Sequence, residues 1–449
     1  MTEDRKKSSE LWTWSELTEA LKIDGHKQGP NVERIIIDSR QTLKGDLFVA
    51  LSGDPGPRFN PTNISDRDGH DYLDDVEEKG GAACLVQRQV ESSLPTLKVA
   101  NTYDALWDLA SIARQRLSGP VIGVTGSSGK TTFKNFLTQG SGGYGSPASF
   151  NNHIGVPLSL VNAPYKSNGT FTLEIGTNHP GEIRPLTNLA RPDVAVLLNV
   201  HQAHIGNFDS LTELRNEKLE IANSINADSM FVCEESLSKY VKGNSYSFGK
   251  TTGCDAQLIS LQDARAEIKV FGEPLKAIIP GGGEHRAMTL CAVLLTQKLL
   301  DLDLSNSLSL TEQAIPEGRG NHTSISEIGV IDDSYNANPQ SMASALETFK
   351  HRKVSGRRII VLGEMLELGD YSRQEHEKIA NYFSSFDKVF TVGEGFQELP
   401  GAEWRAEADS ALIEEILKAL LPGDSILVKG SNRVFWTNKF VDRLTESLS

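Results

Sequence analysis

The chain has 449 residues, with 45 lysines and arginines against 59 aspartates and glutamates, so its formal net charge is −14. This excess of acid argues against a protein that coats nucleic acid, because binding along a phosphate backbone depends on clustered lysine and arginine. The composition, 38% hydrophobic and 23% charged, is that of a folded globular protein, and the length predicts two to four domains.

We expect a soluble, cytoplasmic protein that is not inserted in a membrane. The N-terminal residues 1–14 carry charges but no apolar run of the length of a signal peptide, and no stretch approaches the roughly 20 apolar residues of a membrane span. The four cysteines are widely scattered and lack CxxC spacing, which predicts reduced thiols rather than a disulfide framework or a zinc site. They are Cys84, Cys233, Cys254 and Cys291.

Two clusters of turn residues divide the chain, since turn residues gathered between periodic segments are typical of domain joints. They are Leu117–Pro120 and Pro316–Gly320, and each is followed by an apolar run. We therefore predict an α/β protein of three domains, over residues 1–117, 118–317 and 318–449.

The first segment mixes short apolar runs, at residues 34–40, 46–51 and 82–86, with helical patterns, and it predicts a mixed α/β domain. The middle segment opens with a strand over residues 120–126, a glycine-rich turn and a helix over residues 131–139. This order predicts a parallel-sheet ATPase domain of the P-loop type.

The last segment alternates apolar runs with helical patterns, which predicts βαβ units and a parallel, Rossmann-like sheet. The predicted strands lie at residues 328–331, 358–362, 388–392 and 425–428. The predicted helices lie at residues 341–354, 372–386, 408–421 and 432–444.

The strongest motif is the glycine-rich turn Gly123–Thr132. Such a turn presents backbone N–H groups to phosphates at the positive end of a helix. Lys130 is expected to reach the β- and γ-phosphates and the Thr131 hydroxyl to hold Mg²⁺, although Val124 replaces the first glycine of the usual pattern. We predict ATP or GTP binding. The residues of the turn expected to contact nucleotide are Gly126, Ser127, Ser128, Gly129, Lys130, Thr131 and Thr132.

Two side chains follow other predicted strands of the middle segment. Glu174 comes after the run Phe171–Leu173, and His204 follows the run that ends at Val200. Because ligand groups gather at the carboxyl ends of strands in open α/β sheets, we expect both to become metal ligands beside the phosphate turn.

Further motifs follow the phosphate turn in order. They are N-N-x-x-G-V-P from Asn151, E-x-G from Glu174, N-x-x-x-A-H from Asn199 and K-x-E-I from Lys218. In this order, and with a turn of the form T-G-x-x-G-K-T, they resemble the Mur ligases, the ATP-dependent amide ligases that build the peptidoglycan stem peptide.

The rest of the chain resembles the branch of this family that adds a dipeptide. The motifs at residues 332–342, 361–369 and 428–431 are similar to those of the ligase that adds D-alanyl-D-alanine, and residues 37–53 and 68–86 resemble its uridine-nucleotide-binding region. The resemblance implies that the substrates are D-alanyl-D-alanine and UDP-N-acetylmuramoyl-tripeptide. It also implies an acyl-phosphate intermediate, release of ADP and phosphate, a role in cell-wall synthesis, and a monomeric enzyme.

The resemblance also implies roles for individual residues. Lys130 would bind the γ-phosphate, and Thr131 with Glu174 would hold one Mg²⁺. His204 and a carbamylated Lys218 would hold a second, because a neutral amine that captures CO₂ becomes a carboxylate-like ligand. The implied nucleotide contacts are His285, Arg319, Asp333 and Asn336. The implied contacts to uridine diphosphate are Ser39 and Arg40, and those to the dipeptide are Lys429 and Ser431.

Several positions depart from the family pattern, none of them at the phosphate or metal positions. Arg286 stands where an asparagine is usual, and its guanidinium could stack on the base. The other departures are Thr289 for a second asparagine, His201 for glycine, Asn432 for arginine, and Phe435–Trp436 for Met-Glu.

Alternatives remain at this stage. A relative that adds diaminopimelate or lysine would fit the same core, but the D-N-P-R run expected of the diaminopimelate-adding relatives is missing from the last segment. Folylpolyglutamate synthetases share the ligase core but not the first segment. Two alternatives belong to other functional classes: a P-loop ATPase without ligase activity, and a binding subunit without catalytic activity. The intact set of Lys130, Thr131, Glu174, His204 and Lys218 argues against the binding subunit.

Overall fold

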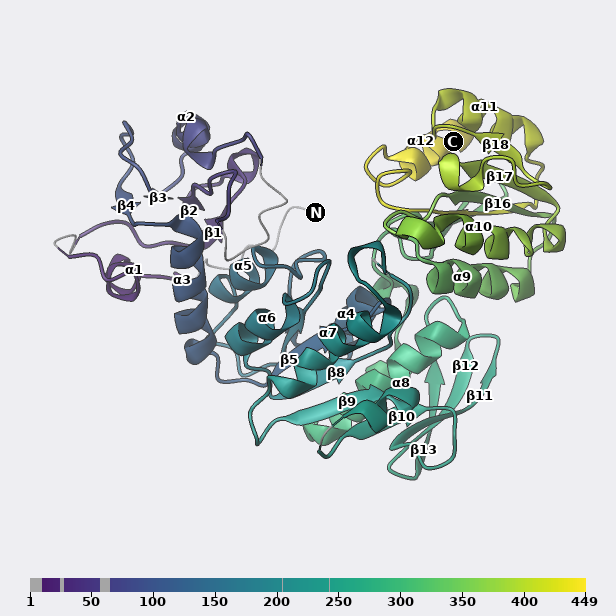
Figure 1. The fold of residues 1–449 in the computed structure, drawn as a ribbon, viewed down its shortest axis with the longest axis horizontal. Coiled ribbons are helices and arrows are strands. Elements are labelled where there is room, and N and C mark those ends of the chain that lie inside the picture. Colours follow the sequence, from purple (N-terminus) through teal and green to yellow (C-terminus); the bar gives the residue numbers. More distant parts are fainter. Residues whose placement is uncertain (1–9, 25–27, 57–64, 204, 242) are drawn as a thin grey trace.

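The computed structural model describes residues 10–24, 28–56, 65–203, 205–241 and 243–449. Within these ranges the strands form three sheets, of four, nine and six strands. Figure 1 shows the sheets following one another along the molecule, from the purple N-terminal part through the teal middle part to the green and yellow C-terminal part. The prediction of an α/β protein with parallel sheets is confirmed.

The first sheet is parallel throughout, in the order β1-β2-β3-β4. Its strands are β1 (Arg34–Ile36), β2 (Asp46–Val49), β3 (Ala83–Val86) and β4 (Thr96–Lys98), and its helices are α1 (Trp14–Ala20), α2 (Leu73–Glu78) and α3 (Thr102–Arg116). The indole N–H of Trp107 on α3 donates to the His153 carbonyl at 2.8 Å, and Leu106 and Val156 belong to one buried cluster. The first part of the chain therefore shares a core with the middle part.

The middle sheet has the order β13-β12-β11-β10-β9-β8-β5-β7-β6, in which β12 and β13 form an antiparallel extension of a parallel sheet. Its first strands are β5 (Val121–Thr125), β6 (Tyr144–Gly145), β7 (Phe171–Glu174), β8 (Val194–Leu197) and β9 (Met230–Glu234). The others are β10 (Tyr246–Gly249), β11 (Ala256–Gln262), β12 (Arg265–Val270) and β13 (Glu273–Ile278). The helices are α4 (Lys130–Ser141), α5 (Gly155–Val161), α6 (Ile183–Ala190), α7 (Leu211–Asn223) and α8 (Glu284–Leu299).

The last sheet has the order β14-β15-β19-β16-β17-β18, and only β14 runs antiparallel to its neighbour. The strands are β14 (Asn321–Ile325), β15 (Ile328–Asp333), β16 (Arg358–Gly363), β17 (Lys388–Val392), β18 (Glu403–Arg405) and β19 (Ser425–Lys429). The helices are α9 (Pro339–His351), α10 (Ser372–Ala380), α11 (Ser410–Ala419) and α12 (Phe440–Leu448). The four predicted strands thus appear at the expected residues.

The end of the chain differs from the prediction of a helix over residues 432–444. Residues 432–439 form turns, and α12 begins only at Phe440, after Lys439 in the left-handed conformation at φ +48°. The turns place the fully buried ring of Phe435 against Gly363 and Gly430, where a β-carbon would come within 2.7 Å of that ring. Burial of this ring accounts for the delayed start of the helix, since a large apolar side chain gains most from full burial.

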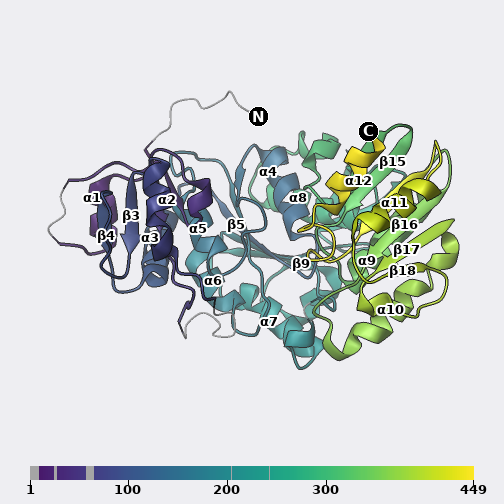
Figure 2. The same cartoon turned by 90° about the horizontal axis from the view of Figure 1, so that it is seen from above.

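The middle and last parts of the chain also share a core. Ile205 and Phe208, from the loop after β8, belong to the same buried cluster as Met365 and Leu368 of the last part. The Gly206 N–H donates to the Glu367 carbonyl at 3.1 Å. Figures 1 and 2 both show α9 beside the middle part of the molecule, where it contacts α8. In the described ranges no helix has the length and apolar character needed to cross a membrane.

Candidate active site

The strand order brings the phosphate turn and Glu174 to one edge of the middle sheet. β5 lies between β7 and β8 and runs parallel to both, with Val124 opposite Glu174 and Thr125 opposite Leu197. Because parallel strands end at the same edge, the turn after β5, the carboxylate at the end of β7 and the loop after β8 converge there.

The phosphate turn is shaped by two glycines and fixed by the loop after β8. Gly126 and Gly129 have φ values of +156° and +84°, so Gly129 takes the left-handed conformation immediately before α4. The Ser128 N–H donates to the Asn199 side-chain oxygen at 3.0 Å, and the Ser127 hydroxyl donates to the His201 carbonyl at 2.9 Å. These bonds hold the turn open at the N-terminus of α4, where backbone N–H groups favour an anion.

Lys130 folds back over this turn. Its ammonium donates to the Gly126 carbonyl at 2.7 Å. Burial lowers the pKa of Lys130 to about 8, the carboxylate of Glu174 acts in the opposite direction, and the charge of Arg319 lowers it further. A cation whose charge is disfavoured by its surroundings is prepared to receive a phosphate.

The Thr131 hydroxyl and the Glu174 carboxylate form a buried pair of oxygen groups that could act as metal ligands. The hydroxyl donates to Glu174 Oε2 at 3.0 Å, and the other carboxylate oxygen, Oε1, forms an ion pair with Lys134 at 2.8 Å. No group of three or more His, Cys, Asp or Glu side chains suited to a metal occurs among the described residues. The adjacent hydroxyl and carboxylate oxygens of Thr131 and Glu174 suit Mg²⁺, which is typically bound by one or two carboxylates together with waters and substrate phosphates.

Lys218 lies on α7 and is buried, with 1% of its surface exposed. Burial lowers the pKa of Lys218 to about 7, and the positive charge of Lys130 acts in the same direction. The neighbouring Glu217 accepts from the N–H groups of Gly181 and Ile183 at 2.8 Å, so its carboxylate is committed to the start of α6. His204, the predicted partner of Lys218, lies outside the described residues.

A large cavity of about 1240 Å³ extends from the phosphate turn between the middle and last parts of the chain. Its lining from the turn includes Ser127, Ser128, Gly129 and Thr132. The apolar lining residues include Leu237, Phe248, Leu261 and Met288, and the polar and charged ones include His285, Arg319, Asp333 and Lys429. A cavity with apolar walls, a few polar groups and a phosphate turn has the character of a nucleotide site.

Asp333 and Lys429, which line this cavity, are the last residues of two neighbouring strands. Asp333 ends β15 and pairs in register with Lys429 at the end of β19, and their side chains form an ion pair at 2.9 Å. The Lys429 ammonium also donates to the Asn336 carbonyl at 3.1 Å. The structure thus brings together Asp333, Asn336 and Lys429. The sequence resemblance implies nucleotide contacts for the first two and a dipeptide contact for Lys429.

Arg319 and His285 reach the same region. The Arg319 guanidinium lies 4.4 Å from the ring centroid of Tyr335 and donates to the Ser149 hydroxyl at 3.3 Å. Enclosure lowers the pKa of His285, and the charges of Arg286 and Lys429 act in the same direction. His285 is therefore neutral and able to accept as well as donate a hydrogen bond.

Arg286 is committed to the backbone. Its buried guanidinium donates to the carbonyls of Gly281 at 3.1 Å, Gly282 at 3.2 Å and Arg319 at 2.8 Å. Arg286 thus links the glycine turn before α8 to Arg319, where the chain enters its last part. Thr289 is likewise committed, because its hydroxyl donates to the His285 carbonyl at 2.9 Å.

Asn338 connects the last part of the chain to the phosphate turn, and the sequence predictions did not include it. Its side chain caps α9 by accepting from the Ser341 N–H at 2.9 Å, and its amide donates to the Ser127 carbonyl at 3.4 Å. An asparagine followed by a proline is a helix-capping signal, and this pair lies shortly before the predicted helix over residues 341–354, so the cap could have been predicted.

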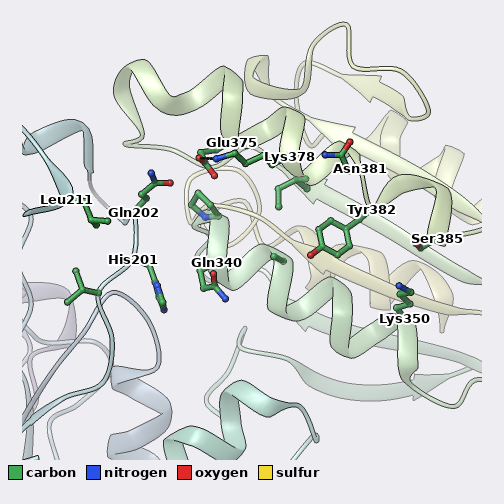
Figure 3. Close-up of a pocket in the computed structure, with 14 residues that line it drawn as sticks. His201, Gln202, Leu211, Gln340, Lys350, Glu375, Lys378, Asn381, Tyr382 and Ser385 are labelled. Atoms are coloured by element: carbon green, nitrogen blue, oxygen red, sulfur yellow. Dashed lines mark hydrogen bonds and ion pairs between the residues drawn. The ribbon is translucent and has the colours of Figure 1, made fainter. Parts of the chain in front are cut away.

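A second cavity, of about 660 Å³, adjoins the first, and the two share the lining residues Val200, His201, Gln340, Ala343 and Tyr382. Figure 3 shows His201 and Gln202 on one side, with Gln340 of α9 and the Glu375–Lys378 pair of α10 on the other. Burial lowers the pKa of His201, and the charge of Lys218 acts in the same direction. His201, where the family pattern has glycine, thus stands between the two cavities.

Several of the predicted ligand contacts do not line the large cavity. From the middle part these are Gly126, Lys130, Thr131, Glu174 and Lys218, and from the other parts they are Ser39, Arg40 and Ser431. The Ser39 hydroxyl lies 3.4 Å from Asp75, and the exposed Arg40 forms an ion pair with Asp38 at 2.8 Å, both within the first part of the chain. Ser431 is buried, and its hydroxyl oxygen accepts from the Leu366 N–H at 2.9 Å. All four cysteines are free, and burial raises the pKa of Cys84, Cys233 and Cys291 to about 12.

Comparison with known proteins places these features in a family. Residues 124–296 match the Mur ligase middle domain, and residues 318–432 match the Mur ligase, glutamate ligase domain. The UDP-N-acetylmuramoyl-tripeptide–D-alanyl-D-alanine ligase of Rickettsia prowazekii is 31% identical over 85% of this chain and 87% of its own length. The ligase of the same name from Escherichia coli is 30% identical over 93% of this chain and 95% of its own length.

Solved structures agree in fold over almost the whole chain. A crystal structure of MurF from Acinetobacter baumannii superimposes with a TM-score of 0.79 at 26% identity, covering 97% of this chain and 99% of its own. MurF from Thermotoga maritima in complex with ADP gives a TM-score of 0.76 at 28% identity, covering 92% of this chain and 97% of its own.

Proposed function

Because this chain belongs to the Mur ligase family, we propose that it is an ATP-dependent ligase that joins D-alanyl-D-alanine to UDP-N-acetylmuramoyl-tripeptide. The product is the pentapeptide precursor of peptidoglycan. The observation that carries the proposal is one cavity of about 1240 Å³, lined by the phosphate turn from the middle part and by Asp333 and Lys429 from the last part. The names and near-complete coverage of the relatives support the dipeptide as the added group.

We propose that the phosphate turn binds the triphosphate of ATP. The N–H groups of the turn and the Lys130 ammonium would meet the β- and γ-phosphates. His285, Arg319, Asp333 and Asn336 would contact the rest of the nucleotide, since all four line the cavity. The apolar lining residues, such as Phe248 and Met288, are suited to the face of the base.

Two Mg²⁺ ions belong to the same proposal. Thr131 and Glu174 would hold one, which their paired oxygens fit. Lys218 and His204 would hold the other, provided that Lys218 is carbamylated, because an ammonium cannot bind a cation. The pKa of about 7 leaves part of Lys218 neutral at pH 7, as reaction with CO₂ requires. Bound Mg²⁺ supplies positive charge to the phosphates.

The proposed reaction has two steps. A tripeptide carboxylate oxygen attacks the γ-phosphorus, a bond from oxygen to phosphorus forms, the bond to the β-phosphate oxygen breaks, and ADP leaves. The dipeptide amine then attacks the acyl carbon, the tetrahedral intermediate collapses, phosphate leaves with the carboxylate oxygen, and the amine loses a proton. Carboxylate and γ-phosphate repel by about 4 kcal/mol at 4 Å and an effective dielectric of 20, and the charge of Lys130 offsets this repulsion.

We propose a division of labour among the three parts of the chain. Residues 1–117, with Ser39 and Arg40, would hold the uridine diphosphate end of one substrate, and residues 118–317 would hold ATP. Residues 318–449, with Lys429 and Ser431, would receive the dipeptide. Closure of the last part over the middle part would exclude water from the acyl phosphate, and the Asn338–Ser127 contact supports such an approach. We further propose that the enzyme acts as a monomer in the cytoplasm.

The test is to incubate the protein with ATP, Mg²⁺, UDP-N-acetylmuramoyl-tripeptide and D-alanyl-D-alanine, and to weigh the nucleotide product. The predicted result is a product heavier than the tripeptide by one dipeptide less water, with one ADP for each product. Reactions with diaminopimelate, lysine or D-alanine alone are the matched controls. Product only with a single amino acid, or phosphate release independent of both acceptor substrates, would refute the proposal in favour of the alternatives.

A further inference from the structure

Lys134 is a buried lysine that the proposed reaction does not use. It lies on α4, one turn after Lys130, and 3% of its surface is exposed. Burial of a charged lysine is costly unless it is paired and hydrogen-bonded, so the position requires an explanation.

The Lys134 ammonium contacts three oxygen atoms. It forms an ion pair with Glu174 Oε1 at 2.8 Å, donates to the Ser146 carbonyl at 2.7 Å and donates to the Ala148 carbonyl. Two of these contacts are hydrogen bonds to backbone carbonyls, and the third is the ion pair with the Glu174 carboxylate. Its position is therefore fixed from three directions.

Glu174 is fixed by the same arrangement. One carboxylate oxygen faces Lys134, and the other accepts from the Thr131 hydroxyl at 3.0 Å. The carboxylate is 1% exposed, so water does not compete for the oxygen that Lys134 holds. Only the oxygen beside Thr131 is presented toward the phosphate turn.

The loop over residues 146–149 is the other element that Lys134 holds. Ala148 has a φ of +44°, a conformation that is unfavourable for alanine and that the Lys134 contact supports. The loop ends at Ser149, whose hydroxyl lies 3.3 Å from that of Thr131 and accepts from Arg319. Lys134 thus joins two sides of the proposed metal position, the Glu174 carboxylate and the Ser149 hydroxyl.

We propose that Lys134 is a positioning residue: it holds Glu174 so that a single carboxylate oxygen faces the metal beside Thr131, and it sets the 146–149 loop that brings the Ser149 hydroxyl next to the Thr131 hydroxyl. This rests on the proposed function, since it concerns the metal that accompanies ATP. Groups that orient metal ligands typically change metal affinity by roughly 10–100-fold when they are removed.

The test measures the affinity of the full-length protein for a non-hydrolysable ATP analogue by calorimetry, with Mg²⁺ and with EDTA. The ratio of the two affinities is the magnesium-dependent increment. Lys134→Met removes the charge, and Lys134→Gln also removes it but keeps two donors for the loop carbonyls. Lys298→Met is the matched control, because Lys298 forms an exposed ion pair with Glu273 elsewhere in the middle part.

We expect both Lys134 variants to lose most of the increment, by roughly 10–100-fold, while the affinity in EDTA stays at the wild-type value. A wild-type increment in either variant would overturn the proposal. An equal loss with and without Mg²⁺ would also overturn it, since it would mean that Lys134 supports the whole nucleotide site. If Lys134→Met does not fold, Lys134→Gln decides by the same criteria. A wild-type protein without any increment would refute the proposed function itself.

Discussion

Nucleotide binding is predicted to draw a proton onto Lys130. In the free protein its pKa is about 8, so at pH 8 about half of the molecules carry the charge. A triphosphate at the turn supplies negative charge against the ammonium and returns the pKa to at least its ordinary value of 10.5, so that nearly every molecule is protonated. The expected uptake is therefore about half a proton at pH 8 and about a tenth of a proton at pH 7.

The assay is calorimetric titration of a non-hydrolysable ATP analogue in buffers of different ionisation enthalpy, at both pH values. The slope of the apparent enthalpy against buffer enthalpy gives the number of protons taken up. Lys130→Met should remove the uptake, and Lys298→Met should leave it unchanged. The same slope in Lys130→Met as in the wild-type protein, or a slope near zero at pH 8, would refute the assignment of Lys130 to the phosphates.

Three other predictions concern single side chains. Lys218→Ala should abolish turnover and regain part of it with added short carboxylic acids, because these can replace a carbamate; full activity without them would exclude the carbamate. Asn338→Ala should lower the free energy of unfolding by about 1 kcal/mol, as loss of a helix cap does, and raise the KM for ATP. The matched cap removal Asp409→Ala on α11 should cost similar stability without changing that KM. Arg286→Met should destabilise the protein by about 2–4 kcal/mol in denaturant unfolding, because three carbonyls lose a donor; a change within error would show that the link is dispensable.

The parts of the fold that were predictable are those in which a local pattern decides the structure. Strands buried on both faces read as continuous apolar runs, which is why β15, β16, β17 and β19 appear where the sequence placed them. The phosphate turn was likewise predictable, since its glycines, lysine and threonine act through backbone geometry.

The chain end was not predictable in the same way. Residues 432–444 have a helical pattern, yet Phe435 is drawn into a space beside Gly363 and Gly430, and the helix is delayed to Phe440. Gly363 is far from Phe435 in the sequence, and Gly430 lies before the helical pattern begins. The space that they leave for the ring is therefore visible only in the folded structure.

The site shows the same limit. Lys134 reads in the sequence as an ordinary helical lysine, and its partner Glu174 becomes its neighbour only because β7 pairs with β5. Arg286 reads as a candidate for stacking on the base. Its N–H groups also donate to the carbonyls of Gly281 and Gly282, two of the three left-handed glycines before α8, and spacing alone did not indicate these bonds. The contacts of Lys134 and Arg286 are therefore set by tertiary structure and could not be predicted from sequence spacing.

The central claim is that the protein activates the tripeptide carboxylate as an acyl phosphate before the dipeptide is added. It is tested most directly with a tripeptide substrate labelled with ¹⁸O at both oxygens of that carboxylate. The account predicts that each inorganic phosphate released carries one ¹⁸O and that the new amide keeps the other. Unlabelled phosphate in the presence of ATP, Mg²⁺ and D-alanyl-D-alanine would contradict it.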